Sequence, residues 1–132
     1  MDYDLDNVFN DESTKPQSNW FKFDKVGDKV VGVVTDIMTK AGDNGFKDQK
    51  VFTLRQKDNE EVLVGFSVEK DYLMQRTKNV RKGDILGLEF TKEIPPTVKG
   101  YAAAKSIEPR VKYTKEGDAE RALDGIAPKF VA

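Results

Sequence analysis

Cysteine and histidine are both absent from this sequence of 132 residues. Without cysteine the chain has no disulfide, thiol nucleophile or zinc knuckle, and without histidine it lacks the commonest general base. It also has no Gly-Lys-Ser/Thr phosphate loop, no nucleophile elbow and no dense group of acidic metal ligands. Asp43, Asp48 and Asp58 are isolated turn residues and do not form an acid/base pair. We therefore expect a protein that is not an enzyme and that uses no metal or cofactor.

Long hydrophobic runs are missing as well. No apolar stretch approaches the roughly 20 residues that cross a bilayer, and Met1-Asp2-Tyr3-Asp4 is unlike a secretory leader. The apolar fraction of 38% and the charged fraction of 34% are typical of a globular domain with some polar extension. The length suits one hydrophobic core. These features predict a single-domain cytoplasmic protein without a membrane segment.

The net charge of −1 conceals a separation of charge along the chain. Residues 1–13 contain five acids and no base, and residues 116–132 contain four acids and two bases. Residues 14–115 carry 20 Lys and Arg against 14 Asp and Glu, an excess of six positive charges. A basic body attracts polyanions, although an excess of this size is also common on ordinary protein surfaces.

The middle of the chain carries the patterns of regular structure. Valine-rich residues 29–37 predict a long first strand, and Gly32 within it predicts a bulge or a sharp bend. The spacing of apolar residues after Ser67 predicts one helix that ends near Thr77. The other expected strands, the last of which ends before Pro109, cover residues 50–56, 61–66, 85–92 and 101–107.

The two ends of the chain differ from this body. Residues 1–18 have scattered apolar groups without periodicity, and we expect an acidic disordered leader. Residues 114–132 are expected to form a flexible C-terminal tail that packs loosely or serves a partner, with a short helix over residues 118–123. The ordered domain is thus expected to cover residues 19–113.

The order of three strands, a helix and two strands, with a glycine-bearing first strand, resembles the oligonucleotide/oligosaccharide-binding (OB) fold over residues 20–113. The resemblance implies an all-β fold, a five-stranded β-barrel with one helix between strands three and four. It also implies that ligands lie across strands two and three, between the loop that joins strands one and two and the loop that joins strands four and five.

Residues suited to single-stranded nucleic acid occur where that fold places its ligands. Such a site needs cations for phosphates and flat side chains for base stacking, which contributes about 1–3 kcal/mol per base. Phe46 and Tyr101 border loops and are the expected stacking platforms, although packing into a barrel rim is an equal alternative. On strand two, Arg55 indicates that Val51 and Thr53 face outward with it, and that Phe52 and Leu54 face the core. The candidate nucleic-acid-binding residues are Lys40, Phe46, Lys47, Lys50, Arg55, Lys92, Lys99 and Tyr101.

Two further groups have less specific interpretations. Trp20 precedes the first strand in a Trp-Phe-Lys-Phe run, where it is either a base platform or, in the preferred interpretation, a plug for the bottom of the barrel. Lys78, Arg81 and Lys82 follow the helix on the side of an OB barrel that usually faces away from the groove. We interpret them as a solvated surface.

The leader interleaves carboxylates with apolar groups in Asp2, Tyr3, Asp4, Leu5, Asp6 and Phe9. This pattern is similar to the acidic tip of bacterial single-stranded-DNA-binding proteins, which recruits replication and repair partners. In that family the tip is C-terminal and ends in phenylalanine, whereas Phe9 is internal here. The segment is expected to bind a partner or to cover the basic groove, and a purely solubilising tail is the alternative.

The expected function is sequence-tolerant binding and protection of single-stranded DNA in replication, recombination or repair, in a phage or plasmid system. A phage protein of this kind would act in the host cytoplasm. Two alternatives stay open: a protein-interaction or virion-associated barrel, and an RNA-binding OB domain. A homo-oligomer is compatible with the exposed strand edges of such a fold.

Overall fold

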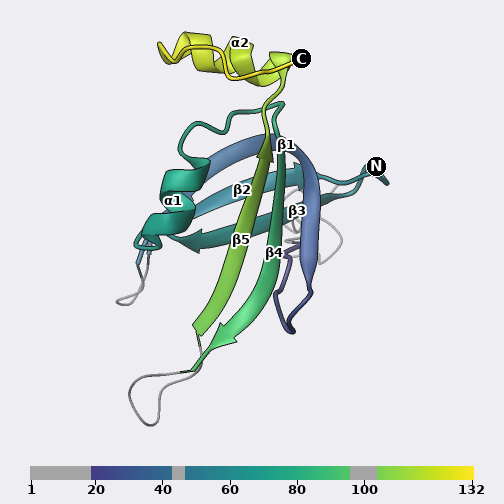
Figure 1. Cartoon of the computed structure of the whole chain (residues 1–132), viewed down its shortest axis with the longest axis vertical. Coiled ribbons are helices and arrows are strands. Elements are labelled where there is room, and N and C mark those ends of the chain that lie inside the picture. The colour runs from purple at the N-terminus through teal and green to yellow at the C-terminus, as the bar shows by residue number, and fades with distance from the viewer. Residues whose placement is uncertain (1–18, 43–46, 96–103) are drawn as a thin grey trace, which may run out of the picture.

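The computed structural model describes residues 19–42, 47–95 and 104–132. It confirms the predicted order of three strands, a helix and two strands (Figure 1). The elements are β1 (Lys29–Lys40), β2 (Gln49–Arg55), β3 (Glu61–Ser67), α1 (Asp71–Thr77), β4 (Ile85–Ile94), β5 (Ala104–Lys112) and α2 (Lys115–Leu123). Within the described ranges no helix is long and apolar enough to cross a bilayer.

All five strands join one antiparallel sheet in the order β3-β2-β1-β4-β5. The central strand β1 pairs with β4 through its first residues and with β2 from Val33 onward. A Cβ at Gly32 would lie 2.7 Å from the carbonyl oxygen of Arg55, so only glycine permits this approach of β1 to β2. The register of this pair shifts between Val34 and Asp36. The first strand thus bends from one half of the sheet into the other.

The sheet is curved but not closed. β3 and β5 are its two edges, and in the described part of the chain no ladder joins them. In Figure 1 the β4–β5 hairpin crosses in front of β2 and β3, with α1 beside β5. The protein is therefore mostly β, with a five-stranded antiparallel sheet that is compatible with a barrel-like fold.

The core fills the concave side of this sheet. Alternate residues of the strands point inward, including the fully buried Phe52, Leu54 and Leu86. Helix α1 adds Leu73, and Phe21 and Phe23 pack against the same cluster from the segment before β1. The predicted inward orientation of Phe52 and Leu54 is confirmed.

Strand β5 continues through Pro109, so the prediction that it ends before this residue is wrong. Pro109 is buried and pairs with Leu88 of β4. Proline lacks an N–H donor, but β5 is an edge strand with a ladder on one side alone, and such a strand tolerates proline.

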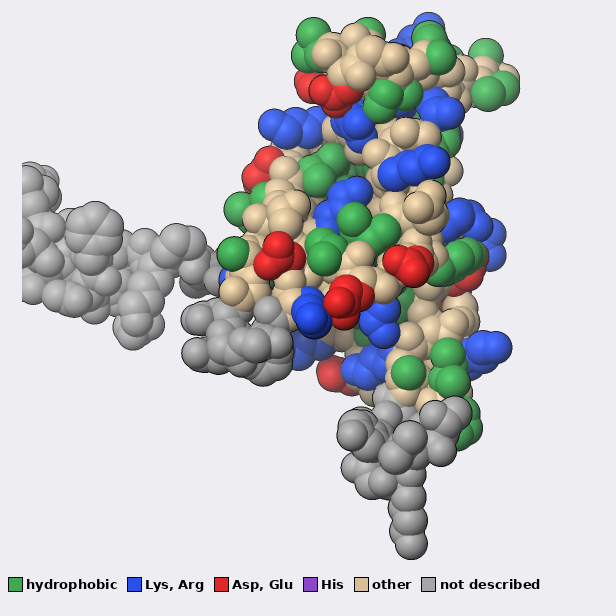
Figure 2. Space-filling model, turned by 90° about the vertical axis from the view of Figure 1, so that its left-hand side faces the viewer, with side chains coloured by type: hydrophobic (Ala, Val, Ile, Leu, Met, Phe, Trp, Pro, Cys, Tyr) green, Lys and Arg blue, Asp and Glu red, His purple; other side chains and the backbone are tan. Residues whose placement is uncertain are grey.

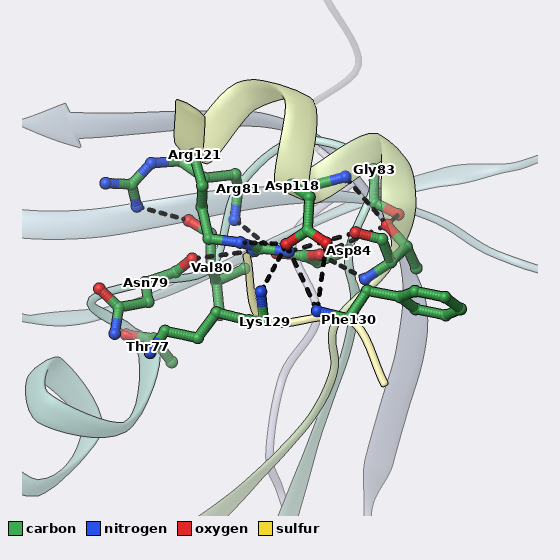
Figure 3. Close-up of polar contacts among 12 residues, drawn as sticks. Thr77, Asn79, Val80, Arg81, Gly83, Asp84, Asp118, Arg121, Lys129 and Phe130 are labelled. Carbon is green, nitrogen blue, oxygen red and sulfur yellow. Dashed lines mark hydrogen bonds and ion pairs between the residues drawn. The ribbon is translucent and has the colours of Figure 1, made fainter. Parts of the chain in front are cut away.

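The C-terminal segment differs from the expected loose tail. Helix α2 is attached to the turn before β4 by Arg121, whose side chain is completely buried and forms an ion pair with the equally buried Asp84 (Figure 3). Arg121 also lies 2.8 Å from Asp118 and donates to the Asn79 carbonyl oxygen. The contacts with Asp84 and Asn79 are polar and join residues that are 37 and 42 positions apart, so hydrophobic periodicity gave no sign of them.

Candidate nucleic-acid interface

The outer face of β1, β2 and β3 is the convex surface made by the side chains that alternate with the core. On β2 it carries Val51, Thr53 and Arg55, as predicted. The register places Val51 opposite Met38 of β1 and Gly65 of β3. Met38 is 50% exposed, so an apolar side chain near the middle of this face is accessible to solvent.

Trp20 lies on this outer face. Residues 19–21 run parallel to β3 and form backbone hydrogen bonds to Leu63. A Cβ at Gly65 would lie 3.2 Å from Cζ3 of Trp20, so the glycine lets the indole ring approach the strand closely. The same position lies 3.4 Å from a methyl group of Val51, which places the ring beside that buried valine.

The preferred interpretation of Trp20 as a barrel plug is therefore wrong. Phe21 and Phe23, whose ring centroids are 4.8 Å apart, pack against the core instead. The alternation of the Trp-Phe-Lys-Phe run is a signal that could have shown this, because it places Trp20 on the face opposite to both phenylalanines. Trp20 is half-buried, and its ring lies against the outer face of β2 and β3.

Lys40 adjoins Trp20. Its ammonium group lies 5.6 Å from the centroid of the indole ring, within the range of a cation–π interaction. Lys40 is the last residue of β1, pairs with Gln49 and is exposed. The structure thus brings one predicted cation together with a flat aromatic surface.

Arg55 lies on the same face near its opposite end. Lys40 is level with Gln49 and Arg55 is six residues farther along β2, a separation of about 20 Å at 3.3 Å per residue. Arg55 is exposed and pairs with Glu61 across the β2–β3 ladder. Two predicted cations therefore mark the two ends of one face.

Lys50 does not join them. Residues 50 and 55 of one strand point to opposite faces, and the Lys50 ammonium donates a hydrogen bond of 3.3 Å to the Thr77 carbonyl oxygen at the end of α1. Partial burial, together with the nearby charge of Arg81, lowers the pKa of Lys50. This geometry gives Lys50 a structural role at a helix C-terminus, where a cation is favourable.

The remaining described candidates lie elsewhere. The Lys47 ammonium is 3.6 Å from a carboxylate oxygen of Glu69, just before α1. Lys92 is exposed on the β4–β5 hairpin, where it pairs with Ser106. The other candidates fall outside the described residues: Phe46, Lys99, Tyr101, and the leader residues Asp2, Tyr3, Asp4, Leu5, Asp6 and Phe9.

The basic turn after α1 borders the outer face in part. The Lys82 ammonium lies 3.9 Å from the carboxylate of Asp36, which is level with Thr53. Arg81 is turned away and lies 2.7 Å from Asp124 after α2. On the side of the molecule shown in Figure 2, Lys and Arg side chains are mixed with Asp and Glu, so this side presents no continuous basic surface.

Within residues 19–42, 47–95 and 104–132 there is no group of three acidic side chains that could hold a metal ion. The densest polar cluster, around Arg121 and Asp84, is internally hydrogen-bonded (Figure 3). Comparisons with protein-family models, curated proteins and solved structures found no match.

Proposed function

We propose that this protein binds single-stranded DNA with little sequence preference, across the outer face of β1, β2 and β3 of an OB-type barrel. The observation that carries the proposal is the position of Trp20, which lies on that face over Gly65 with the Lys40 ammonium 5.6 Å from its ring. A single-strand site combines a stacking surface with cations for phosphates. Protection of transient single strands during replication, recombination or repair, in a phage or plasmid system, is the role we propose.

Binding would rearrange one contact that is already present. The Lys40 ammonium covers part of the Trp20 ring in the free protein. A phosphate competes for this cation, because a charge-assisted contact is stronger than an exposed cation–π contact. Movement of Lys40 to the phosphate would leave the indole free to stack on a base. Arg55 would bind the sugar-phosphate backbone of the DNA about 20 Å from Lys40, the distance that six residues of β2 span. The affinity should fall steeply as salt is raised, since each phosphate contact releases counterions.

The single tryptophan provides a direct test. We expect oligo-dT of about 30 nucleotides to quench Trp20 fluorescence. Quenching should reach half-saturation at the same concentration as the anisotropy of the labelled oligonucleotide. Trp20→Ala should weaken binding by about five- to 150-fold, the equivalent of 1–3 kcal/mol of stacking. Trp20→Phe should restore part of the affinity because it keeps a flat side chain.

Tyr72→Ala is the control, since Tyr72 is an exposed aromatic residue on α1, away from the outer face. Thermal unfolding of each variant separates a loss of binding from a loss of fold. Binding without quenching, or equal affinities of wild type and folded Trp20→Ala, would remove Trp20 from the site. The absence of binding at low salt, also after deletion of residues 1–13, would refute the function. Duplex DNA and RNA competitors decide which nucleic acid is preferred.

A further inference from the structure

The outer face of β1, β2 and β3 continues around β1 onto β4 and β5. Val33 of β1 is level with Arg55 of β2 on one side and with Ile85 of β4 on the other. Ile85 is in turn level with Lys112 of β5, which is exposed. Residues that are level in an antiparallel ladder point to the same face, so Arg55 and Lys112 lie on one continuous outer surface. The surface that carries Trp20 therefore extends beyond Arg55.

This extension contains a hollow of about 240 Å³. Val31 of β1 and Gly87 of β4 pair with each other and form its floor, and Val31 is 59% exposed. The hollow is smaller than the roughly 300–1,000 Å³ of sites for drug-sized ligands, and a nucleobase is smaller than such a ligand. Gly87 lies two residues, or about 7 Å, from the level of Arg55. The hollow thus offers an apolar floor for a single base beside the proposed path of the DNA.

Gly87 is the residue that keeps this hollow open. Glycine weakens the interior of a strand, and it is usually explained by a positive φ, by steric crowding or by the close approach of a ligand. The first two explanations do not apply, because Gly87 is not among the positive-φ glycines and an added Cβ would meet its nearest neighbour at an ordinary 3.6 Å. The close approach of a ligand remains.

The charges that line the hollow cancel in number but are separated in position. Arg110 is level with Gly87. Lys112 lies two residues farther along β5, on the side of Arg55. Glu89 lies two residues beyond Gly87 in the opposite direction. A nucleotide has the same order of groups, because its phosphate is an anion and the far edge of its base carries hydrogen-bond donors.

Glu89 is the group positioned to contact that edge of the base. It is half-buried and level with Lys29 of β1 and Glu108 of β5. Glu108 is already engaged, since it accepts a hydrogen bond of 2.8 Å from Tyr72 and lies 4.0 Å from Arg76. Within the described residues the Glu89 carboxylate has no ion-pair partner. A carboxylate accepts from the 4-amino group of cytosine, whereas thymine presents a carbonyl oxygen at this position.

We propose that the hollow is a second base site, in which a base lies on the apolar floor and donates its amino group to Glu89. The inference rests on the proposed function and deepens it: the single strand passes from Trp20 along the outer face to Arg55 and onward to the hollow. Lys112 binds the phosphate of the nucleotide in the hollow. The site gives the protein a modest preference for cytosine over thymine or uracil, because their 4-carbonyl oxygen is repelled by the carboxylate.

The test compares the affinities of oligo-dC and oligo-dU of about 30 nucleotides, whose bases have one ring and no methyl group. Wild type should bind oligo-dC about three- to tenfold more tightly, the size of one partly exposed hydrogen bond. Glu89→Gln should remove this preference, because an amide both accepts and donates and so pairs with either base. Gly87→Leu should remove it as well by filling the hollow, whereas quenching of Trp20 should persist.

Glu93→Gln is the matched control, since Glu93 is exposed on the same strand, outside the hollow, and the substitution removes the same charge. It should keep the wild-type preference, which separates recognition of the base from a change in net charge. Circular dichroism and thermal unfolding confirm that each variant is folded.

Equal affinities of wild type for the two oligonucleotides overturn this inference, and so does a preference that folded Glu89→Gln or Gly87→Leu retains. Quenching of Trp20 in the same titrations shows in that case that the proposed function still stands. A wild type that binds neither oligonucleotide at low salt overturns the proposed function and this inference together.

Discussion

The two helices in the described part of the chain attach to the sheet by opposite means. α1 inserts Leu73, which is 6% exposed, into the hydrophobic core. α2 inserts Arg121, which is completely buried, and leaves Leu123 in solvent. Because Leu123 is exposed and Arg121 is buried, the docking of α2 is specified by hydrogen bonds and ion pairs. The first kind of attachment tolerates imprecise geometry, whereas the second requires each partner in place.

The largest effect is expected from a break in the polar attachment. Asp84→Ala would leave the Arg121 guanidinium buried without its main partner, which typically costs about 3–5 kcal/mol. Urea unfolding should show this loss of stability. Asp124→Ala removes the partly exposed partner of Arg81 and should cost less than about 1 kcal/mol. Similar effects of the two substitutions would mean that the buried pair does not hold α2.

The apolar attachment is tested by a matched pair of leucines. Leu73→Ala should destabilise the protein by about 2–5 kcal/mol, because it leaves a cavity in the core. Leu123→Ala should change stability by no more than about 0.5 kcal/mol, because this side chain is 81% exposed. Thermal unfolding at low protein concentration gives both values. A large loss for Leu123→Ala under these conditions would contradict the exposure of Leu123.

The smallest expected effect is on the stability of the protein at acidic pH. Backbone N–H donation from Lys129, together with Arg121 and Phe130, lowers the pKa of Asp118 against the opposing effect of burial. A carboxylate with a lowered pKa stabilises the folded state above its ordinary value of 3.8, and this contribution is lost as the pH falls through the folded-state pKa. The melting temperature of wild type should therefore fall more steeply than that of Asp118→Asn below about pH 4, near the unfolded-state pKa. Parallel pH profiles would show that Asp118 contributes nothing to the polar attachment.

Part of the candidate interface followed from sequence, and part did not. The alternation along β2 correctly placed Phe52 inside and Arg55 outside. The same alternation places Lys50 on the side opposite to Arg55. Lys50 was chosen for its charge alone, and the predicted site therefore combined two residues that face in opposite directions. Trp20 was considered but assigned to the interior, although the alternation of the Trp-Phe-Lys-Phe run places it opposite to the core-facing phenylalanines. Its neighbour Leu63 is more than 40 residues away, so the strand on which it packs left no local pattern.

The sequence by itself determined the order of the strands and α1, the inward residues of β2 and the absence of thiol and imidazole chemistry. These features depend on composition and on periods of two and of 3.6 residues, which are local. Tertiary structure alone decided the continuation of β5 through Pro109, the position of Trp20 over Gly65 and the inverted packing of α2. Each of these depends on which distant parts of the chain become neighbours. β5 has no strand on its outer side, Trp20 meets a glycine of β3, and Arg121 meets a buried carboxylate 37 residues away.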